Sequence, residues 1–580
     1  MSEETQYGLG PTSEAAGSRE NQNIEGCQPS RRLSPGRIVV LLLACYFLFF
    51  FRIGARDLWP PDEPRYAQVA REMLEEDDWV VPHLNGEVYS EKPPLYFWLV
   101  ALISKPFGDV NEATARIPAA SAATLMVLLT YLLGASMVGA REAFWGALIV
   151  ATSAQFVWMG RHGVMDSLMA FCILVALGCF YIGYDKRRPV LYIVGFLPLA
   201  PAALTKGPVG IAVPVVVMTS FLLADVFLRK EGSMRQLAWF GVSVVAGLAI
   251  IAVLVAPWWR AAYEQSNGSY GSLSLLMKQT EGRMLDSYSH YQPFYYYFTN
   301  ILWQLLPWVV FFPLAALEIV RKGNLRENSG LRFVVVWFLS VFLFFTFISG
   351  KRSQYILPLF PAGGLMLGWA LLRAEPDKGR LKDESRFSLP LLVIGLLSVA
   401  GLLALASGAH EYVREQFPMV LAGILVAAAI LTILAAQCAR RPPRIALACV
   451  LIVTTLVTAV LFGYLAPLAN PLASGRAFCN EVLAAMKEGD RLFFFKKYRY
   501  NIHYYMRRHV PELKSNEEVL KALEGSTRIF LVADEGRERS LKLGPAYKVE
   551  QVARAKVGER ETVCLVIQQA GTIPKPNDIR

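Results

Sequence analysis

Residues 95–107 read LYFWLVALISKPF and follow directly on Lys92-Pro93-Pro94. A helix that crosses a bilayer core needs about 20 apolar residues, and this run has only about 13. We therefore predict that the segment lies in the membrane interface or re-enters the membrane, and does not cross it. The prediction fixes the topology, because every loop after residue 107 would change sides if the segment crossed.

About thirteen longer apolar runs remain, and we predict that each crosses the membrane. They begin near residues 37, 113, 142, 166, 190, 208, 237, 296, 331, 354, 388, 417 and 444. With the N-terminus inside, the inner loops are residues 141–142, 185–188, 229–235, 321–326, 373–386 and 440–444. These loops are rich in Lys and Arg, in agreement with the positive-inside rule. An odd number of spans places the C-terminal region outside, which is the periplasm in a Gram-negative host.

The composition supports a membrane protein. Of 580 residues, 54% are hydrophobic and only 18% are charged, whereas soluble domains are about 25% charged. Eight cysteines are too sparse for a disulfide scaffold, and the same figures exclude a disordered or collagen-like chain. The net charge of +11 would suggest nucleic acid in a soluble chain. In a multispanning chain basic inner loops explain it, so we expect no nucleic-acid partner.

The predicted fold is mainly α-helical, a polytopic membrane protein with about 13 transmembrane helices and a small C-terminal α/β domain outside. Residues 1–36 form a disordered cytoplasmic tail, 37–467 the transmembrane domain, and 474–580 the outer domain. Large outer loops span residues 56–112 and 258–293. The outer domain alternates helix-like residues 475–487 and 515–523 with strand-like residues 491–495 and 528–532.

The polar chemistry gathers on the outer side of the membrane. Transporters place their ionisable groups near mid-membrane on broken helices. Charges at the outer mouth instead suit chemistry on a substrate at the membrane surface. A lipid transporter or flippase, the alternative from a different class, predicts mid-membrane charges and pseudo-symmetric halves, and the sequence has neither feature. It also lacks a phosphate-binding glycine loop, a Cys/His metal spacing and a nucleophile elbow.

The first outer loop opens with Pro60-Pro61-Asp62-Glu63-Pro64. Proline fixes φ, so carboxylates beside it are pre-positioned to act as a base, a metal ligand or a partner for a cationic substrate. The structural alternative is that Asp62 caps a helix over residues 64–75 and that Glu63 lies in its first turn. A divalent cation held by Asp62 and Asp166 is left open.

Several outer cations could bind a phosphate. Lys92 stands on the outer side against the charge rule, where its ammonium would neutralise a lipid-linked phosphate or would reach the lipid headgroups. Lys206 and Lys351 are predicted at helix starts, which favour anions. Together with Lys92 and Arg283 they could form one phosphate-binding site.

Asp166 lies at the outer mouth between the third and fourth spans, where a buried carboxylate needs a partner. Arg161 is one candidate, and the alternative is that Asp166 caps the next helix. In the second outer loop the aromatic residues around His290 suit an interfacial belt or stacking against a sugar.

These residues resemble the membrane glycosyltransferases of the C type, the group of protein O-mannosyltransferases and of the 4-amino-4-deoxy-L-arabinose transferases that modify lipid A. The resemblance is greatest to the latter and runs from about residue 37 to 372. It rests on Asp62 to Ala67, Asp78 to Leu84, Tyr89 to Pro93, Asp166, Thr205-Lys206-Gly207, Pro293 to Tyr297, Gly350-Lys351 and Tyr355 to Pro358. One departure is residues 278–283, which read KQTEGR where lipid A transferases tend to have a Glu-His pair before the arginine.

The resemblance implies a polyprenyl-phosphate sugar donor, active-site carboxylates at Asp62 and Asp166, and a lysine at Lys92 that meets the donor phosphate. It implies an inverting glycosyltransferase of the bacterial inner membrane that acts on the periplasmic side. The acceptor would be lipid A or another glycolipid, and the sugar 4-amino-4-deoxy-L-arabinose. A protein O-mannosyltransferase or another hexose transferase remains the alternative. The matching pieces and the second outer loop supply candidate substrate-binding residues: Tyr66, Tyr89, Glu91, His290 and Tyr355.

Overall fold

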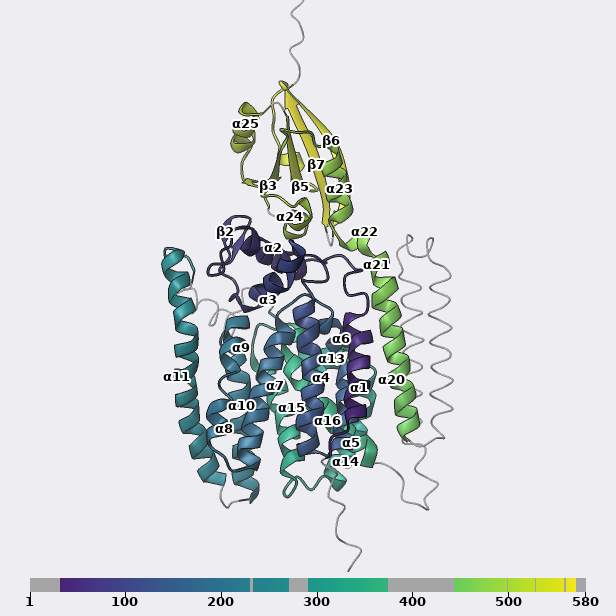
Figure 1. The fold of residues 1–580 in the computed structure, drawn as a ribbon. Coiled ribbons are helices and arrows are strands. Elements are labelled where there is room, and N and C mark those ends of the chain that lie inside the picture. The colour runs from purple at the N-terminus through teal and green to yellow at the C-terminus, as the bar shows by residue number, and fades with distance from the viewer. Residues whose placement is uncertain are drawn as a thin grey trace, which may run out of the picture.

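The protein folds into a helical membrane part with a sheet domain at one end (Figure 1). The computed structural model describes residues 32–229, 233–270, 291–373, 443–497, 499–526, 528–557 and 560–569. The runs predicted near 388 and 417, Arg283, His290 and nearly all of the N-terminal tail lie outside these residues.

Within the described residues, seven helices are long and apolar enough to cross a membrane, or up to nine if each of two bent pairs is one span. The long helices are α4 (Ile117–Met137), α7 (Asp166–Asp185), α10 (Val209–Arg229), α11 (Ser233–Gln265), α15 (Ser329–Phe347), α16 (Phe360–Arg373) with its leading turn η4 (Ser353–Leu359), and α20 (Pro443–Val460) with its continuation η6 (Leu461–Leu465). The bent pairs are α5 (Ala140–Ala151) with α6 (Ala154–Gly160), at 69°, and α13 (Tyr296–Gln304) with α14 (Phe312–Lys322), at 107°. Shorter apolar helices are α1 (Pro35–Cys45), α3 (Leu95–Ser104), α8 (Val190–Val194) and α9 (Leu199–Lys206).

Nine of the eleven predicted runs that fall in described residues coincide with a long helix or a bent pair. The runs near residues 37 and 190 coincide only with shorter apolar helices, α1 and α8 with α9. Close backbone contact holds α5 against α16: a Cβ on Gly146 would lie 2.8 Å from the carbonyl oxygen of Gly364. Small residues permit such approach between membrane helices. The core is thus made mainly of apolar helix faces, and the buried Asp225 and Arg332 within it are paired with each other.

Helix α3 is short, as its sequence predicts, and it lies beneath α2 at the end that carries the sheet domain (Figure 1). The Trp98 indole donates to the carbonyl of Trp79 at 2.7 Å, which ties α3 to the outer loop. Helix α11 differs from expectation, because it continues to Gln265, past the predicted start of the second loop at Trp258. An Arg260–Glu264 pair at 2.8 Å supports this last turn.

The first outer loop is folded. Helix α2 (Asp62–Glu75) begins two residues before the predicted helix, and proline is tolerated there because first-turn N–H groups have no helical partner. Strands β1 (His83–Leu84) and β2 (Glu87–Val88) form a hairpin through Asn85-Gly86, both with positive φ. The Glu72 carboxylate accepts the N–H groups of Asn85 and Gly86 at 2.8 and 3.1 Å, so the hairpin is fixed to α2.

The C-terminal domain contains a five-stranded sheet of order β4-β3-β5-β7-β6, with β3, β4 and β5 parallel and β7 antiparallel to its neighbours. The strands are β3 (Arg491–Phe495), β4 (Glu512–Leu513), β5 (Arg528–Asp534), β6 (Tyr547–Val557) and β7 (Arg560–Gln569). The helices are α23 (Arg476–Ala485), α24 (Tyr500–Met506) and α25 (Asn516–Glu524). The predicted α/β character is confirmed. Helix α24, which is very short, and the hairpin β6–β7, whose β6 strand is mostly exposed and polar, were not predicted from the sequence.

Helix α24 docks the sheet domain onto α2 (Figure 1). The Arg71 guanidinium donates to the carbonyls of Tyr504, at 2.7 Å, and of Val110, at 3.1 Å, and pairs with Asp109. The Tyr504 hydroxyl donates to Val110 at 2.8 Å. These contacts bury polar groups against partners, so the domain and the first loop form one unit.

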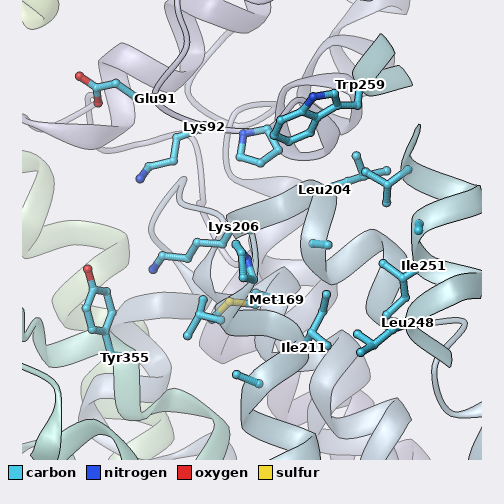
Figure 2. A pocket seen from close by; sticks show the side chains of 18 of the residues that line it. Glu91, Lys92, Met169, Leu204, Lys206, Ile211, Leu248, Ile251, Trp259 and Tyr355 are labelled. Atoms are coloured by element: carbon cyan, nitrogen blue, oxygen red, sulfur yellow. The ribbon is translucent and has the colours of Figure 1, made fainter. Parts of the chain in front are cut away.

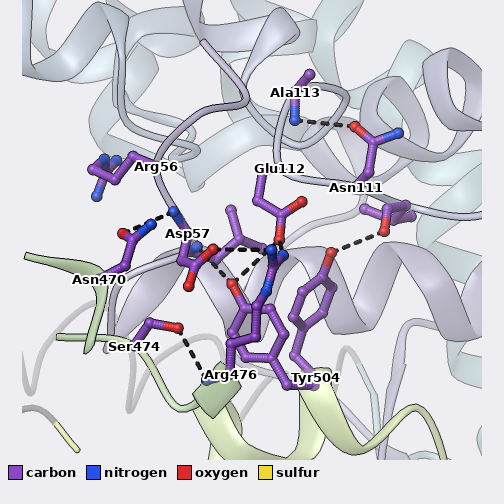
Figure 3. Close-up of polar contacts among 12 residues, drawn as sticks. Arg56, Asp57, Asn111, Glu112, Ala113, Asn470, Ser474, Arg476 and Tyr504 are labelled. Atoms are coloured by element: carbon purple, nitrogen blue, oxygen red, sulfur yellow. Dashed lines mark hydrogen bonds and ion pairs between the residues drawn. The ribbon is translucent and has the colours of Figure 1, made fainter. Parts of the chain in front are cut away.

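A second set of contacts lies at the beginning of the domain (Figure 3). Arg476 pairs with Glu112 and, at 3.2 Å, with Asp57. Asn470 accepts the N–H of Asp57 at 3.1 Å. The chain leaving the last membrane helix is therefore bound to the residues just after the first one.

Replacing Arg71 by alanine should loosen the docked domain. The change leaves the carbonyl of Tyr504 without its donor and Asp109 without its nearer cation, and we expect a loss of about 2–4 kcal/mol in the free energy of unfolding. It is measured by thermal unfolding in detergent and by limited proteolysis between α20 and α23. The control is Arg507→Ala, because Arg507 also contacts Asp109, at 3.4 Å, but is mostly exposed and should change stability little. Equal effects of the two variants would contradict the assignment.

Candidate active site

Glu63 lies at the centre of a buried ion cluster. Its carboxylate is fully buried and pairs with Arg56 at 3.0 Å and with Arg116 at 2.6 Å. It also accepts the backbone N–H of Trp59 at 3.0 Å and of Gly163 at 2.9 Å. Burial opposes ionisation, but Arg116 and Arg56 outweigh it and hold the pKa of Glu63 well below its usual value of 4.5. Its oxygens are thus occupied by the protein, which favours a structural role over a catalytic one.

The arginines of this cluster also satisfy backbone carbonyls where the chain leaves α1. Arg116 donates to the carbonyls of Ile53, Arg56 and Asp57. Arg161 donates to the carbonyls of Leu48 and Phe51, at 3.0 and 2.8 Å. Arg161 therefore serves the end of the first helix and is not the observed ion-pair partner of Asp166.

Asp62, the neighbour of Glu63, has different surroundings. It is 7% exposed and pairs with Arg65, one turn along α2, and with Arg352 at 3.2 Å. Burial alone would raise the pKa of Asp62, but Arg65 and Arg352 overcome it and lower the pKa below 3.8. The predicted capping role is absent, because the Asp62 side chain makes no cap hydrogen bond at the start of α2. Asp62 is an ionised carboxylate at neutral pH.

Asp166 is 4% exposed at the start of α7 and forms an ion pair with Lys206. Lys206 is the last residue of α9, not the first residue of a helix as the sequence suggested, so the attraction to a helix N-terminus does not apply. The Lys206 ammonium also stands 4.6 Å from the centre of the Tyr355 ring. Asp166 and Tyr355 thereby fix the position of Lys206.

A cavity of about 450 Å³ opens between α9, α10 and α11. Figure 2 shows its two parts: Lys92, Lys206 and Tyr355 lie together on one side, and Ile211, Leu248 and Ile251 line the other, with Met169 between them. The apolar part is formed by membrane helices. Two ammonium groups at the mouth of an apolar cavity suit a ligand with an anionic head and a hydrocarbon chain.

The remaining predicted residues divide between this cavity and its rim. Glu91 lines the cavity and pairs with Arg65 at 3.2 Å, and the Tyr89 hydroxyl lies 3.3 Å from Glu91. Tyr66 is buried on α2 beside Arg65. Lys351 is 4% exposed and donates to the carbonyl of Gln292 at 3.2 Å. The structure thus brings Asp62, Glu91 and the cavity mouth together through Arg65.

The open prediction of a divalent cation at Asp62 and Asp166 fits the residues poorly. Each carboxylate is already paired with arginine or lysine, which neutralises the charge that a metal needs. Within the described ranges, no group of three or more His, Cys, Asp or Glu side chains gathers as a metal site. We therefore derive no step through a metal.

Four arginines that shape the site were not predicted from the sequence: Arg56, Arg65, Arg116 and Arg352. Arg65 carries a signal, since a cation three residues after Asp62 on a helix lies on the same face. Arg352 stands next to Lys351, which was predicted as an outer cation. Arg116 has no local signal, because its partner Glu63 lies 53 residues away.

The chain is similar to known proteins in sequence and in fold. A family model described as dolichyl-phosphate-mannose-protein mannosyltransferase matches residues 37–264. The undecaprenyl phosphate-α-4-amino-4-deoxy-L-arabinose arabinosyl transferase of Aeromonas hydrophila is 31% identical over 385 residues, which are 64% of this chain and 68% of the relative. Its counterpart in Serratia proteamaculans is 27% identical over 402 residues, 66% and 69% of the two chains. The crystal structure of ArnT from Cupriavidus metallidurans bound to undecaprenyl phosphate superposes with a TM-score of 0.73 at 20% identity, over 92% of this chain and 98% of that one.

The helical membrane part, the C-terminal sheet domain and the relatives define a membrane glycosyltransferase of the C type. It is a multi-pass protein of the inner membrane. The chain belongs to the family of undecaprenyl phosphate-α-4-amino-4-deoxy-L-arabinose arabinosyl transferases.

Substituting Glu63 by glutamine should destabilise the fold. The variant leaves Arg56 and Arg116 buried without their counter-charge, and we expect a loss of about 3–5 kcal/mol, seen as a lower melting temperature and yield. Asp62→Asn is the matched control, because Asp62 lies outside this cluster. A melting temperature for Glu63→Gln equal to that of the control would show that the cluster is dispensable.

The same pair of variants gives a pH test. Because the pKa of Glu63 in the folded protein is lowered, its contribution to stability is complete above pH 4.5 and is lost as pH falls through that lower pKa. The melting temperature of the wild type should therefore fall as the pH is lowered below 4.5. Glu63→Gln should lack this component, whereas Asp62→Asn should retain it.

Proposed function

We propose that this enzyme transfers 4-amino-4-deoxy-L-arabinose from undecaprenyl phosphate to a phosphate of lipid A, at the periplasmic face of the inner membrane. The observation that carries the proposal is the cavity between α9, α10 and α11, apolar along the membrane helices and cationic at its outer mouth. The names of the relatives supply the sugar and the lipid carrier. The periplasmic side is supported by the basic loops at the opposite ends of the helices.

The donor occupies the cavity with its chain along the apolar wall and its phosphate at the mouth. Lys92 and Lys206 both line this mouth, and compact ammonium groups neutralise phosphate well. Asp166 and Tyr355 keep Lys206 in place. The sequence predicts that Arg283 and Lys351 assist Lys92 and Lys206 in binding the phosphate, and these two roles stay predictions. Neutralising the phosphate stabilises it as the leaving group when the bond to the anomeric carbon breaks.

The sugar then lies above the mouth, beside Glu91, Tyr89 and Tyr66. Aromatic faces suit a sugar ring, and the Glu91 carboxylate, at the cavity rim, suits the ammonium of an amino sugar. Asp62 is connected to this region by Arg65, which pairs with both Asp62 and Glu91. An acceptor oxygen attacks the anomeric carbon from the face opposite the leaving phosphate, so the configuration inverts.

The state of Asp62 bears on the acceptor. A general base works best with a pKa near the working pH, whereas Arg65 and Arg352 lower the pKa of Asp62. A hydroxyl acceptor would need such a base, but a lipid A phosphate is already ionised. Asp62 therefore orients the substrates, and Arg352, 3.2 Å from Asp62, offers a cation to the acceptor phosphate.

The second candidate is transfer of a hexose to the hydroxyl of serine or threonine. The match of residues 37–264 to the mannosyltransferase family model favours it. The low pKa of Asp62 counts against it, and so do the relatives that match over more than half of the chain.

Alanine at Asp62 or at Lys92 should abolish transfer while the protein remains folded. The assay uses purified protein in detergent with lipid, undecaprenyl-phosphate aminoarabinose and lipid A, and reads the mass gain of lipid A. Thermal unfolding verifies that each variant is intact. Normal turnover by either variant contradicts the mechanism, and no mass gain with intact wild type contradicts the proposed substrates.

Filling the cavity should weaken donor binding and leave the chemistry intact. In Ala212→Trp the indole occupies space that we assign to the prenyl chain, and we expect KM for the donor to rise about tenfold or more, the equivalent of 1.4 kcal/mol. Val253→Trp is the control, since Val253 lies on α11 but is 71% exposed and does not line the cavity. A similar KM for both variants would show that the prenyl chain of the donor does not occupy this cavity.

A further inference from the structure

Arg65 is enclosed by aromatic rings from two parts of the molecule. Its guanidinium lies 5.3 Å from the ring centre of Tyr66 and 5.9 Å from that of Tyr89, both in the first outer loop. The third ring is Tyr500, at 5.2 Å, and it belongs to the C-terminal domain. We call these three tyrosines the aromatic cage of Arg65. The outer domain thus contributes one wall to a site that otherwise belongs to the membrane domain.

Within the cage, Arg65 joins the two carboxylates nearest to the proposed reaction. It pairs with Asp62 and, at 3.2 Å, with Glu91, and Glu91 lines the mouth of the cavity. The Arg65 side chain is only 13% exposed. The direction of its planar guanidinium therefore sets where both carboxylates point.

An arginine between two carboxylates has no unique position without further contacts. Its side chain carries about 2 kcal/mol of rotamer entropy, and both of its anionic partners are on the outer loop. A ring face fixes the plane of the guanidinium through cation–π attraction and stacking. Tyr500 supplies this contact from outside the loop, so it restrains Arg65 relative to a separate element.

Tyr500 is itself held in place. It is the first residue of α24, and the preceding Arg499 pairs with Asp534 on β5. Four residues later Tyr504 accepts from Arg71 at 2.7 Å, and the Tyr505 hydroxyl accepts the N–H of Leu58 at 2.8 Å. Both ends of the short helix are therefore anchored, one to the sheet and the other to the membrane domain.

We propose that Tyr500 is a positioning residue for the transfer reaction, which holds Arg65 so that Asp62 and Glu91 face the donor sugar and the acceptor. The inference rests on the proposed function and deepens it, because it gives the C-terminal domain a part in the active site. Tyr500 acts through Arg65 and does not touch the reacting atoms. Undocking of α24 would remove the third wall and free Arg65 to move between the two carboxylates.

The test compares Tyr500→Phe, Tyr500→Leu and Tyr500→Ala in the full-length protein. Phenylalanine keeps the ring face, and its kcat should stay within about twofold of the wild type. Leucine keeps much of the volume but no ring, and both leucine and alanine should lower kcat about tenfold. KM for undecaprenyl-phosphate aminoarabinose should change less than kcat in all three, because Lys92, Lys206 and the apolar wall, which hold the phosphate and the prenyl chain, are untouched.

Arg476→Ala controls for loosened docking, since Arg476 binds Asp57 and Glu112 but not Arg65 (Figure 3). If the two variants have the same melting temperature, Arg476→Ala should keep a higher kcat than Tyr500→Ala. A wild-type kcat in Tyr500→Leu and Tyr500→Ala overturns the proposal, and so does an equal loss in Tyr500→Phe.

A second measurement does not depend on turnover. Phenylglyoxal modifies accessible guanidinium groups, and peptide mass spectrometry follows the peptide that contains Arg65. The modification should be slow in the wild type and in Tyr500→Phe and faster in Tyr500→Ala. Equal rates in Tyr500→Phe and Tyr500→Ala overturn the cage. If the wild type transfers no sugar, the proposed function is wrong, and this measurement alone decides whether Tyr500 holds Arg65.

Discussion

The buried carboxylate of Glu63 is the constraint on which the outer half of the molecule depends. A charge in an apolar interior is stable only when it is paired and fully hydrogen-bonded. Here its partners come from the exit of the first helix, the start of α4 and the turn before α7. Satisfying one carboxylate therefore fixes three segments together and sets the position and direction of α2.

Because α2 is fixed at Glu63, the neighbouring Asp62 is fixed as well, but its side chain points in a different direction. Consecutive residues on a helix point about 100° apart, so one carboxylate faces the interior while the other meets Arg65 and Arg352. The two neighbouring carboxylates therefore have different roles. Glu63 holds α2 in place, whereas Asp62 pairs with Arg65, which in turn pairs with Glu91 at the cavity.

The membrane and the outer domain contribute separate parts of one site. Helices α9, α10 and α11 form the apolar cavity, and the outer loop places Glu91 and Lys92 at its mouth. Helix α24 closes the site from above through its contacts with α2 (Figure 1). A lipid-linked donor suits this division, because its chain stays in the membrane while its sugar reaches the polar loop.

The sequence by itself determined the membrane helices, the short α3 and the strand-and-helix pattern of the outer domain, because length and hydropathy are local properties. It also marked Asp62, Lys92 and Asp166 as outer polar residues. Only the tertiary structure decided the cationic partners of the carboxylates. Glu63 pairs with Arg116, Asp166 with Lys206, and Asp62 with Arg352, and these partners are 53, 40 and 290 residues apart in the sequence. Such pairings follow from how helices pack, and no local pattern encodes that packing.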